Sequence, residues 1–179
     1  MDLTATKTVL ITGAGKRLGQ AMAVALAQDG YDVAIHYQSS REGAEHTAEA
    51  VRAAGTRAVL VQADLSNEGE TRELIAKATE ALGGQLGVLI NNASVFKDDT
   101  AQSHSRESWD LHMNVNLRAP ICLAQAFAEQ LNSVQRGVII NMIDQRVWKL
   151  NPNFFTYTLS KSALWSATKT LAQALAPNI

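Results

Sequence analysis

The chain has 179 residues, the size of one domain, and 46% of them are hydrophobic, which is enough to form an ordinary core. Its formal net charge of −1 offers no basic surface for nucleic acid, and no apolar run approaches the roughly 20 residues of a membrane-spanning helix. The N-terminus leads directly into a glycine loop rather than a secretory signal, so we expect a cytoplasmic protein with a single domain over residues 1–179.

Short apolar runs rich in β-branched residues alternate with longer amphipathic stretches along the chain. This alternation is typical of βαβ units, in which helices cover both faces of a parallel sheet. Gly30 and Gly55 stand where left-handed caps would end the first two helices. The predicted strands are residues 8–12, 33–37, 58–62, 88–91 and 138–142. The expected fold is α/β, a doubly wound parallel sheet of the Rossmann type.

The last predicted helix covers about residues 156–176 and ends at Ala-Pro-Asn-Ile. A doubly wound sheet commonly continues beyond this point with a sixth strand. We therefore expect the C-terminal strands to be missing, either because the chain is cut or because the fold is unusually short.

A glycine-rich loop joins the first predicted strand to a helix. Gly13 and Gly19 bound the loop, and Arg17 and Leu18 lie between them. Glycines let the backbone approach a pyrophosphate, and the free N–H groups at the helix start favour an anion. Glycine clusters also form ordinary turns, but the strand–loop–helix context is the one that a dinucleotide site requires. We therefore predict that these four residues bind a nucleotide cofactor.

The end of the second predicted strand indicates which nicotinamide cofactor binds. An NAD site commonly has an acidic residue there, which would repel a 2′-phosphate. Here the strand ends at His36 and Tyr37, both candidates for cofactor binding, and the first acid is Glu42. Arg17 and Ser40, with Arg41 as a further candidate, are suited to donate to a phosphate, so NADPH is the predicted cofactor. Ser40 is equally suited to capping the next helix, and the two roles are compatible.

Tyr157 and Lys161 lie four residues apart in the last predicted helix, so both project from one face. An ammonium group near a phenol would lower the tyrosine pKa toward neutral pH, as acid–base catalysis needs. Such a pair is also common on protein surfaces. The nucleotide loop upstream favours a proton-transfer centre.

Together, several motifs resemble those of the short-chain dehydrogenase/reductase family over essentially the whole chain. The matching positions are residues 12–19, Asp64 and Leu65, Asn91 to Ser94, Asn116, and the pair Tyr157 and Lys161. The resemblance implies that Asp64 lies by the adenine, with Leu65 also at the cofactor, and that Lys161 binds the nicotinamide ribose. It further implies that the cofactor is lined by Asn92, Ala93 and Ser94.

The same resemblance implies that Tyr157 is the proton donor and that Asn116 holds a water in the proton relay. Members of the family are commonly tetramers that pair through the helices holding these two residues, so a homotetramer is expected. The missing C-terminal piece would carry a sixth strand, a mobile substrate loop and a seventh strand.

Two positions depart from the common family pattern. Arg17 stands where the middle glycine of the loop is usual, which strengthens the phosphate interpretation. Asp144 stands where the family usually has a serine that bonds the substrate carbonyl. A carboxylate would repel a developing alkoxide unless protonated, whereas a basic nitrogen in the substrate would accept a proton from an acid there. Alternatively, Asp144 caps a turn and pairs with Arg146.

Arg17, Asp144 and the catalytic pair resemble the pteridine reductase branch of the family. In that branch an aromatic residue at the position of Phe96 stacks on the pterin ring against the nicotinamide. Phe96 is alternatively a simple core or lid aromatic. The predicted substrate contacts are Ser94, Phe96, Asp144 and Tyr157. Further walls of the pocket are expected from Trp148, Phe154 and Phe155.

We therefore expect hydride transfer from NADPH to a carbon–nitrogen double bond of a dihydropterin or similar bicyclic heterocycle. Tyr157 would supply the proton directly or through Asp144, Lys161 would lower the tyrosine pKa, and Asn116 would support a water. One alternative is a carbonyl reductase acting on a ketone such as a 3-oxoacyl group. Another is a non-catalytic NADP-binding module or fragment.

The remaining cysteine and histidine residues suggest no further chemistry. Cys122 has apolar neighbours and is expected to be packed and inert. No metal is expected, because metal-ligand spacing is absent from His36, His46, His104 and His112.

Overall fold

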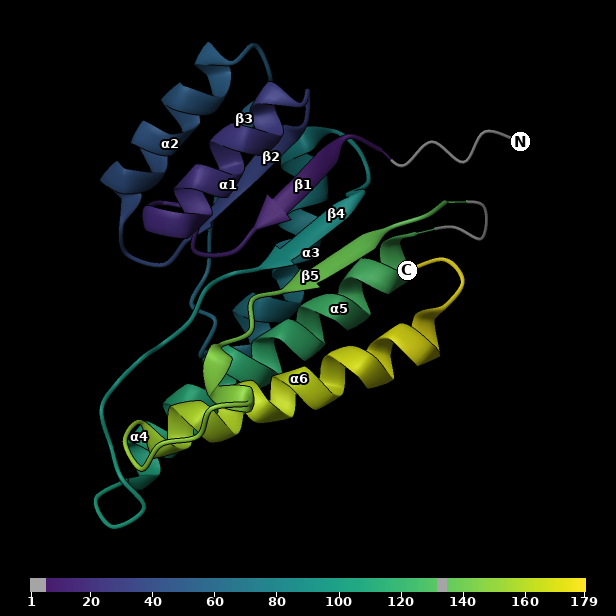
Figure 1. The fold of residues 1–179 in the computed structure, drawn as a ribbon. Coiled ribbons are helices and arrows are strands. Elements are labelled where there is room, and N and C mark those ends of the chain that lie inside the picture. Colours follow the sequence, from purple (N-terminus) through teal and green to yellow (C-terminus); the bar gives the residue numbers. More distant parts are fainter. Residues whose placement is uncertain (1–5, 132–134) are drawn as a thin grey trace.

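The computed structural model describes residues 6–131 and 135–179, so the prediction about a secretory signal falls partly on residues outside it. The described chain forms one parallel five-stranded sheet of order β3-β2-β1-β4-β5 (Figure 1). The strands are β1 (Thr8–Ile11), β2 (Asp32–Tyr37), β3 (Ala58–Gln62), β4 (Val88–Asn91) and β5 (Val138–Asn141). All five predicted strands are found with ends within one residue, which confirms the doubly wound α/β fold.

Helices cover both faces of the sheet. Figure 1 shows α1 and α2 on one face and α3 and α5 on the other, with α6 beside α5. The helices are α1 (Arg17–Gln28), α2 (Arg41–Ala53), α3 (Glu68–Leu82), α4 (Arg106–Met113), α5 (Ala119–Gln130) and α6 (Phe155–Leu175). A π-helical turn, η1 (Asn114–Arg118), joins α4 to α5, and a 3₁₀ turn, η2 (Gln145–Val147), follows β5. No helix among the described residues is both long and apolar enough to cross a membrane.

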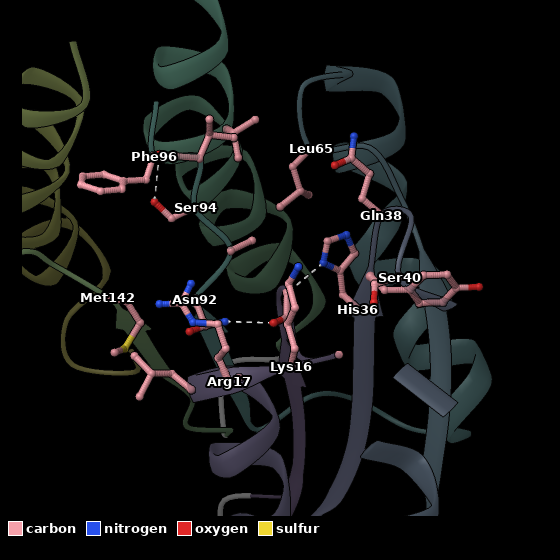
Figure 2. Close-up of a pocket in the computed structure, with 18 of the residues that line it drawn as sticks. Lys16, Arg17, His36, Gln38, Ser40, Leu65, Asn92, Ser94, Phe96 and Met142 are labelled. Carbon is pink, nitrogen blue, oxygen red and sulfur yellow. Dashed lines mark hydrogen bonds between the residues drawn. The ribbon is translucent and has the colours of Figure 1, made fainter. Parts of the chain in front are cut away.

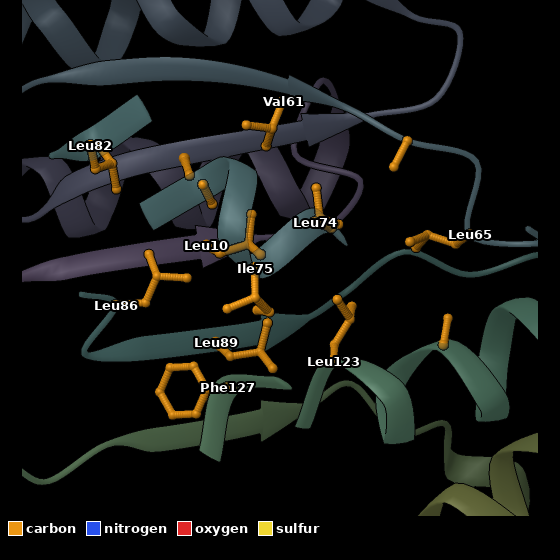
Figure 3. Close-up of a cluster of buried hydrophobic side chains, with 14 of the residues drawn as sticks. Leu10, Val61, Leu65, Leu74, Ile75, Leu82, Leu86, Leu89, Leu123 and Phe127 are labelled. Carbon is orange, nitrogen blue, oxygen red and sulfur yellow. The ribbon is translucent and has the colours of Figure 1, made fainter. Parts of the chain in front are cut away.

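The sheet separates two hydrophobic cores, which explains why its strands read as continuous apolar runs. In β1, Leu10 faces the core beneath α3 and α5, whereas Val9 and Ile11 face the core beneath α1 and α2. Figure 3 shows Leu10 and Leu89 of the sheet packed with Leu74 of α3 and with α5 side chains. The expected left-handed caps are also found, with φ of +85° at Gly30 and +91° at Gly55.

Because all strands are parallel, their carboxyl ends meet at one edge of the sheet. The strand order reverses direction between β1 and β4, and the crevice outside such a switch point is where open α/β sheets bind ligands. Within the described residues β5 pairs only with β4, and its Val138 and Ile140 side chains are exposed. β5 is therefore the edge at which the expected sixth strand would pair.

Candidate active site

A cleft of about 660 Å³ opens at the carboxyl ends of the strands. Figure 2 shows side chains from the glycine loop, the end of β2 and the segment after β4 converging on it. Every predicted cofactor or substrate residue lines this cleft, whereas Asn116 lies behind the wall. The tertiary structure thus brings the predicted set together, and the role of each residue stays a prediction.

The glycine loop is shaped by two close approaches. Gly13 has a φ of +65°, and a Cβ there would lie 3.0 Å from the Cα of Ala93. At Gly19 an added Cβ would lie 2.4 Å from the carbonyl oxygen of Gly13, closer than any side chain tolerates. Arg17 has a φ of +54°, in the left-handed region that favours glycine. The loop therefore holds an arginine at a strained backbone position.

His36 holds the glycine loop through hydrogen bonds to the backbone. Its Nδ1 accepts a hydrogen bond from the Gly13 N–H at 3.0 Å, so Nε2 carries the ring proton and donates to the Ala63 carbonyl at 3.1 Å. Burial lowers the pKa of His36 to about 4, although the Ala63 carbonyl and the charge of Asp64 oppose the shift. His36 lines the cleft as predicted, but its two nitrogens already bond the backbone. Its role is to hold the loop.

The loop carries two cations rather than one. In Figure 2 the Arg17 side chain points to the side of the cleft where Asn92 and Met142 lie, whereas Ser40 lies on the other side, beyond His36. The prediction that Arg17 and Ser40 meet at one phosphate therefore does not fit their placement, and Lys16, which was not among the predicted residues, also lines the cleft. The sequence signal that could have identified Lys16 is its place next to Arg17 in the glycine loop.

Tyr157 and Lys161 face the cleft from one side of α6, as predicted. The Tyr157 hydroxyl donates to Asp144 Oδ2 at 3.0 Å. Lys161 Nζ donates to the Met142 carbonyl at 2.9 Å and lies 5.9 Å from the centre of the Tyr157 ring. Both side chains are buried. The phenol therefore contacts a carboxylate directly and an ammonium group only across the ring.

This geometry reverses the predicted pKa shift of the tyrosine. Burial, and then the hydrogen bond and charge of Asp144, raise the pKa of Tyr157 well above its usual range. Burial lowers the pKa of Lys161 to about 8, with Asp144 opposing the shift. The prediction that Lys161 lowers the Tyr157 pKa is wrong for the chain alone, because the carboxylate lies nearer the hydroxyl than the ammonium does. Tyr157 is held as the neutral phenol.

Asp144 caps a turn, as one of the two interpretations expected, and it also contacts Tyr157. Its Oδ1 accepts from the Arg146 N–H at 2.8 Å and so caps η2, while Oδ2 accepts from Tyr157 at 3.0 Å. Partial burial alone would raise the pKa of Asp144, but the Arg146 N–H, the Tyr157 hydroxyl and the Arg146 guanidinium together lower it. The side chain is therefore an ionised acceptor at neutral pH rather than the protonated acid that sequence analysis considered.

Phe96 lies at the mouth of the cleft, 52% exposed, and is not a core residue. Its ring stacks on Phe154 with centres 4.1 Å apart and meets the Tyr157 ring edge-on at 4.7 Å. The Arg146 guanidinium lies 5.2 Å from the Phe96 ring centre. The three aromatic residues expected as further walls do not line the cleft. Phe154 backs the Phe96 ring, Phe155 lies beside His104, and Trp148 is 70% exposed and packs on Trp165 of α6.

The sequence profile of the short chain dehydrogenase family matches residues 7–179. The chain belongs to the short-chain dehydrogenase family. Among curated relatives, the 3-oxoacyl-[acyl-carrier-protein] reductase FabG of Staphylococcus epidermidis is 31% identical over 170 residues, which cover 95% of this chain and 69% of that protein.

Two solved structures are similar to this chain at higher sequence identity. The FolM alternative dihydrofolate reductase 1 from Brucella canis, complexed with NADP, is 46% identical with a TM-score of 0.92, over 99% of this chain and 71% of that one. A short-chain dehydrogenase from Burkholderia cenocepacia, in complex with NADP, is 33% identical with a TM-score of 0.89, over 97% and 71% of the two chains. This short-chain dehydrogenase thus spans about 70% of the length of these relatives.

In this short-chain dehydrogenase Asn116 lies in the π-helical turn η1 and is fully buried. Its amide donates to the Val95 carbonyl at 2.9 Å and to Ser160 Oγ at 3.1 Å, and its Oδ1 accepts from the Val95 N–H at 2.8 Å. Single π-helical turns often occur at functional sites. Asn116 therefore ties the segment after β4 to α6, a role that only the tertiary structure reveals.

Sequence reasoning also missed Arg146 as part of the cleft. It named Arg146 only as a partner for a capping acid, yet its guanidinium lies against Phe96 and Phe154 and 3.4 Å from Asp144. A basic residue two positions after an unusual acid was the available signal.

Proposed function

We propose that this chain is an NADPH-dependent reductase that acts on a carbon–nitrogen double bond of a pterin-like bicyclic heterocycle. The observation that carries the proposal is the contact between Tyr157 and the ionised Asp144, 3.0 Å apart, beside the exposed ring of Phe96. The FolM alternative dihydrofolate reductase, 46% identical, supports this substrate class.

The residues of the cleft suit NADPH. Glycine at positions 13 and 19 lets the loop pack against Ala93 and Asn92, which a Cβ at either position would prevent, and so keeps the loop in the close shape that a pyrophosphate can follow. Lys16 and Arg17 supply positive charge, and residues 36–41 contain no acid that would repel a 2′-phosphate. When bound, NADPH supplies the hydride.

The chain's own groups manage the proton. Burial and Asp144 raise the pKa of Tyr157, so the phenol keeps its proton at neutral pH, as a donor for reduction must. A base for alcohol oxidation would instead need the phenolate, which this environment disfavours. In the balanced reaction the substrate carbon gains a hydride, its nitrogen gains the Tyr157 proton, and solvent returns that proton to the phenol. Any proton that reaches the substrate through Asp144 comes first from Tyr157.

Asp144 favours a pterin-like substrate over a ketone. A ketone acquires negative charge on oxygen as it is reduced, and the carboxylate of Asp144 opposes that charge. A heterocycle with ring N–H groups can instead donate to the carboxylate, while Phe96 offers an aromatic face. The 3-oxoacyl-[acyl-carrier-protein] reductase FabG supports the ketone alternative, but it is 31% identical to this chain, whereas FolM is 46% identical.

Side-by-side assays test the proposal. With NADPH, dihydrobiopterin and dihydrofolate are expected to be reduced, and an acetoacetyl thioester is expected to turn over at least about tenfold more slowly. Turnover of the thioester with none on any pterin would overturn the proposal. NADPH binding by calorimetry with no turnover of either substrate would instead support a non-catalytic module.

We also propose, from the family resemblance, that the protein assembles as a homotetramer through the helices that hold Asn116 and Tyr157. Light scattering of the purified protein measures the assembly directly. A monomeric mass at micromolar concentration would contradict it.

A further inference from the structure

Two polar pairs cross from the α4–η1 helix to α6 at the same spacing. His112 Nδ1 lies 2.7 Å from Thr156 Oγ1, and Asn116 Nδ2 donates to Ser160 Oγ at 3.1 Å. Residues four apart lie on one helix face, so the two pairs form successive rungs of one ladder. All four residues are fully buried. Hydrophobic side chains would pack these helices equally well, so the polar ladder calls for another reason.

The same two residues hold the segment that follows β4. Asn116 bonds both the N–H and the carbonyl of Val95, at 2.8 and 2.9 Å. His112 Nε2 accepts from the N–H of Lys97 at 3.1 Å. Phe96 is the residue between these two fixed backbone positions, and its ring meets Tyr157.

The hydrogen bonds fix the state of His112. Because Nε2 accepts from Lys97, the neutral ring carries its proton on Nδ1 and donates it to Thr156 Oγ1. The Thr156 hydroxyl in turn donates to Asp99 Oδ2, and Asp99 Oδ1 accepts from the Thr156 N–H at 3.0 Å. Asp99 also accepts from Ser108 of α4 at 3.0 Å. The network therefore joins α4, the segment that carries Phe96, and the first turn of α6 immediately before Tyr157.

We propose that His112 is a positioning residue for the substrate site. Its Nε2 holds the Lys97 backbone so that the Phe96 ring stays at a fixed height against Tyr157, and the substrate ring is thereby aligned with the tyrosine hydroxyl. This inference rests on the proposed function, in which Phe96 contacts the substrate. An apolar residue at 112 would preserve the helix packing, but it would leave the Lys97 N–H without its acceptor.

Two substitutions separate the two nitrogens of His112. In His112→Gln the longer side chain carries an oxygen near the position of Nε2 and can still accept from Lys97. In His112→Asn the amide reaches only the position of Nδ1, so the Thr156 contact can persist while the Lys97 acceptor is lost. The readouts are amide hydrogen exchange at Lys97 by NMR, KM and kcat for dihydrobiopterin, and NADPH affinity by calorimetry.

For His112→Asn we expect exchange at Lys97 and KM each to rise about tenfold, with NADPH affinity within about twofold of wild type. For His112→Gln both values should stay close to wild type. Equal exchange in the two variants overturns the inference. Faster exchange only in His112→Asn with an unchanged KM also overturns it, because His112 would then hold the backbone without aligning the substrate.

Failure of the proposed function is separately visible. If the wild type reduces only ketones, the pterin proposal fails. Amide exchange at Lys97 and KM for the ketone, measured in the same two variants, still test whether His112 positions the substrate site. Should the asparagine variant not fold, the wild type supplies the test. A pterin analogue bound together with NADPH is expected to slow exchange at Lys97, and unchanged exchange would contradict the inference.

Discussion

The hydroxyl of Tyr157 donates a 3.0 Å hydrogen bond to Asp144 Oδ2, and the carboxylate on which it rests is itself held by the backbone N–H of Arg146. Burial, and then this contact, raise the pKa of Tyr157 and so stabilise the phenol over the phenolate.

Tyr157→Phe should lower kcat for the reduced substrate by about 10³-fold, because the ring is kept and only the proton donor is removed. NADPH affinity, measured by calorimetry, should change little. The Phe96 contact with the ring is retained, so a large loss of substrate binding is not expected. Turnover equal to wild type would remove Tyr157 from its role.

Asp144→Ser should shift preference toward ketones, because a hydroxyl can donate to a carbonyl oxygen where a carboxylate repels it. We expect the ratio of kcat/KM for the acetoacetyl thioester to that for dihydrobiopterin to rise about tenfold or more. Asp144→Asn is the matched control, which removes the charge but keeps the size. A ratio that does not move in either variant argues against Asp144 as the selecting group.

Asp144→Asn should also change the pKa of Tyr157. Asp144 contributes to the raised pKa of Tyr157, so its removal should lower that pKa toward the ordinary tyrosine value. Ultraviolet titration of the phenol, with Tyr157→Phe as reference, measures the change. A pKa of Tyr157 that stays equally high in Asp144→Asn would mean that burial alone sets it.

Arg17→Gly should stabilise the free protein, because residue 17 has a φ of +54° that glycine adopts without strain. The expected gain in the free energy of unfolding is about 1 kcal/mol. Arg17→Ala loses the same side chain without relieving the backbone, so the difference between the two variants in urea unfolding isolates the strain. Equal stability of the two variants would show that the loop is not strained at this residue.

Arg17→Ala tests whether the predicted 2′-phosphate contact survives the placement of the Arg17 side chain on the Asn92 side of the cleft, away from Ser40. If Arg17 makes that contact, the substitution should weaken NADPH binding at least about tenfold more than NADH binding, because a guanidinium at a 2′-phosphate has no counterpart with NADH. Lys16→Ala is measured beside it, since Lys16 also lines the cleft. If Arg17→Ala weakens both cofactors equally while Lys16→Ala weakens NADPH alone, the phosphate contact belongs to Lys16.

His36 should make the protein less stable in acid. Its pKa is lowered to about 4 in the folded chain against an ordinary 6.5, so the unfolded chain takes up the proton first. The stabilisation is fully present above about pH 6.5 and is lost as the pH falls toward 4, by about 3 kcal/mol over that range. Urea unfolding between pH 7 and 4.5 measures the slope. His36→Asn, which can still accept from Gly13, should flatten it, and an unchanged slope would assign the effect to other groups.

Local patterns were enough to predict the framework. Apolar runs and glycine positions gave all five strands to within one residue, and the last helix is observed at Phe155–Leu175 against a predicted 156–176. These features depend on periodicity and backbone freedom, which neighbouring residues determine. The glycine loop was recognisable for the same reason, because a loop between a strand and a helix has the same requirements wherever it occurs, whereas Asp64, Asn92 and Asn116 were named from the family resemblance.

What the sequence by itself determined is therefore the parallel α/β sheet and most of the residues that line its cleft, Lys16 and Arg146 being exceptions. Only the tertiary structure decided how those residues act on one another: that Asp144 raises the pKa of Tyr157, that His36 supports the loop, and that His112 bonds the backbone beside Phe96. The physical reason is that a pKa and a hydrogen bond depend on burial and on distances of a few ångströms. Helix packing sets both between residues far apart in the chain, and no local pattern records them.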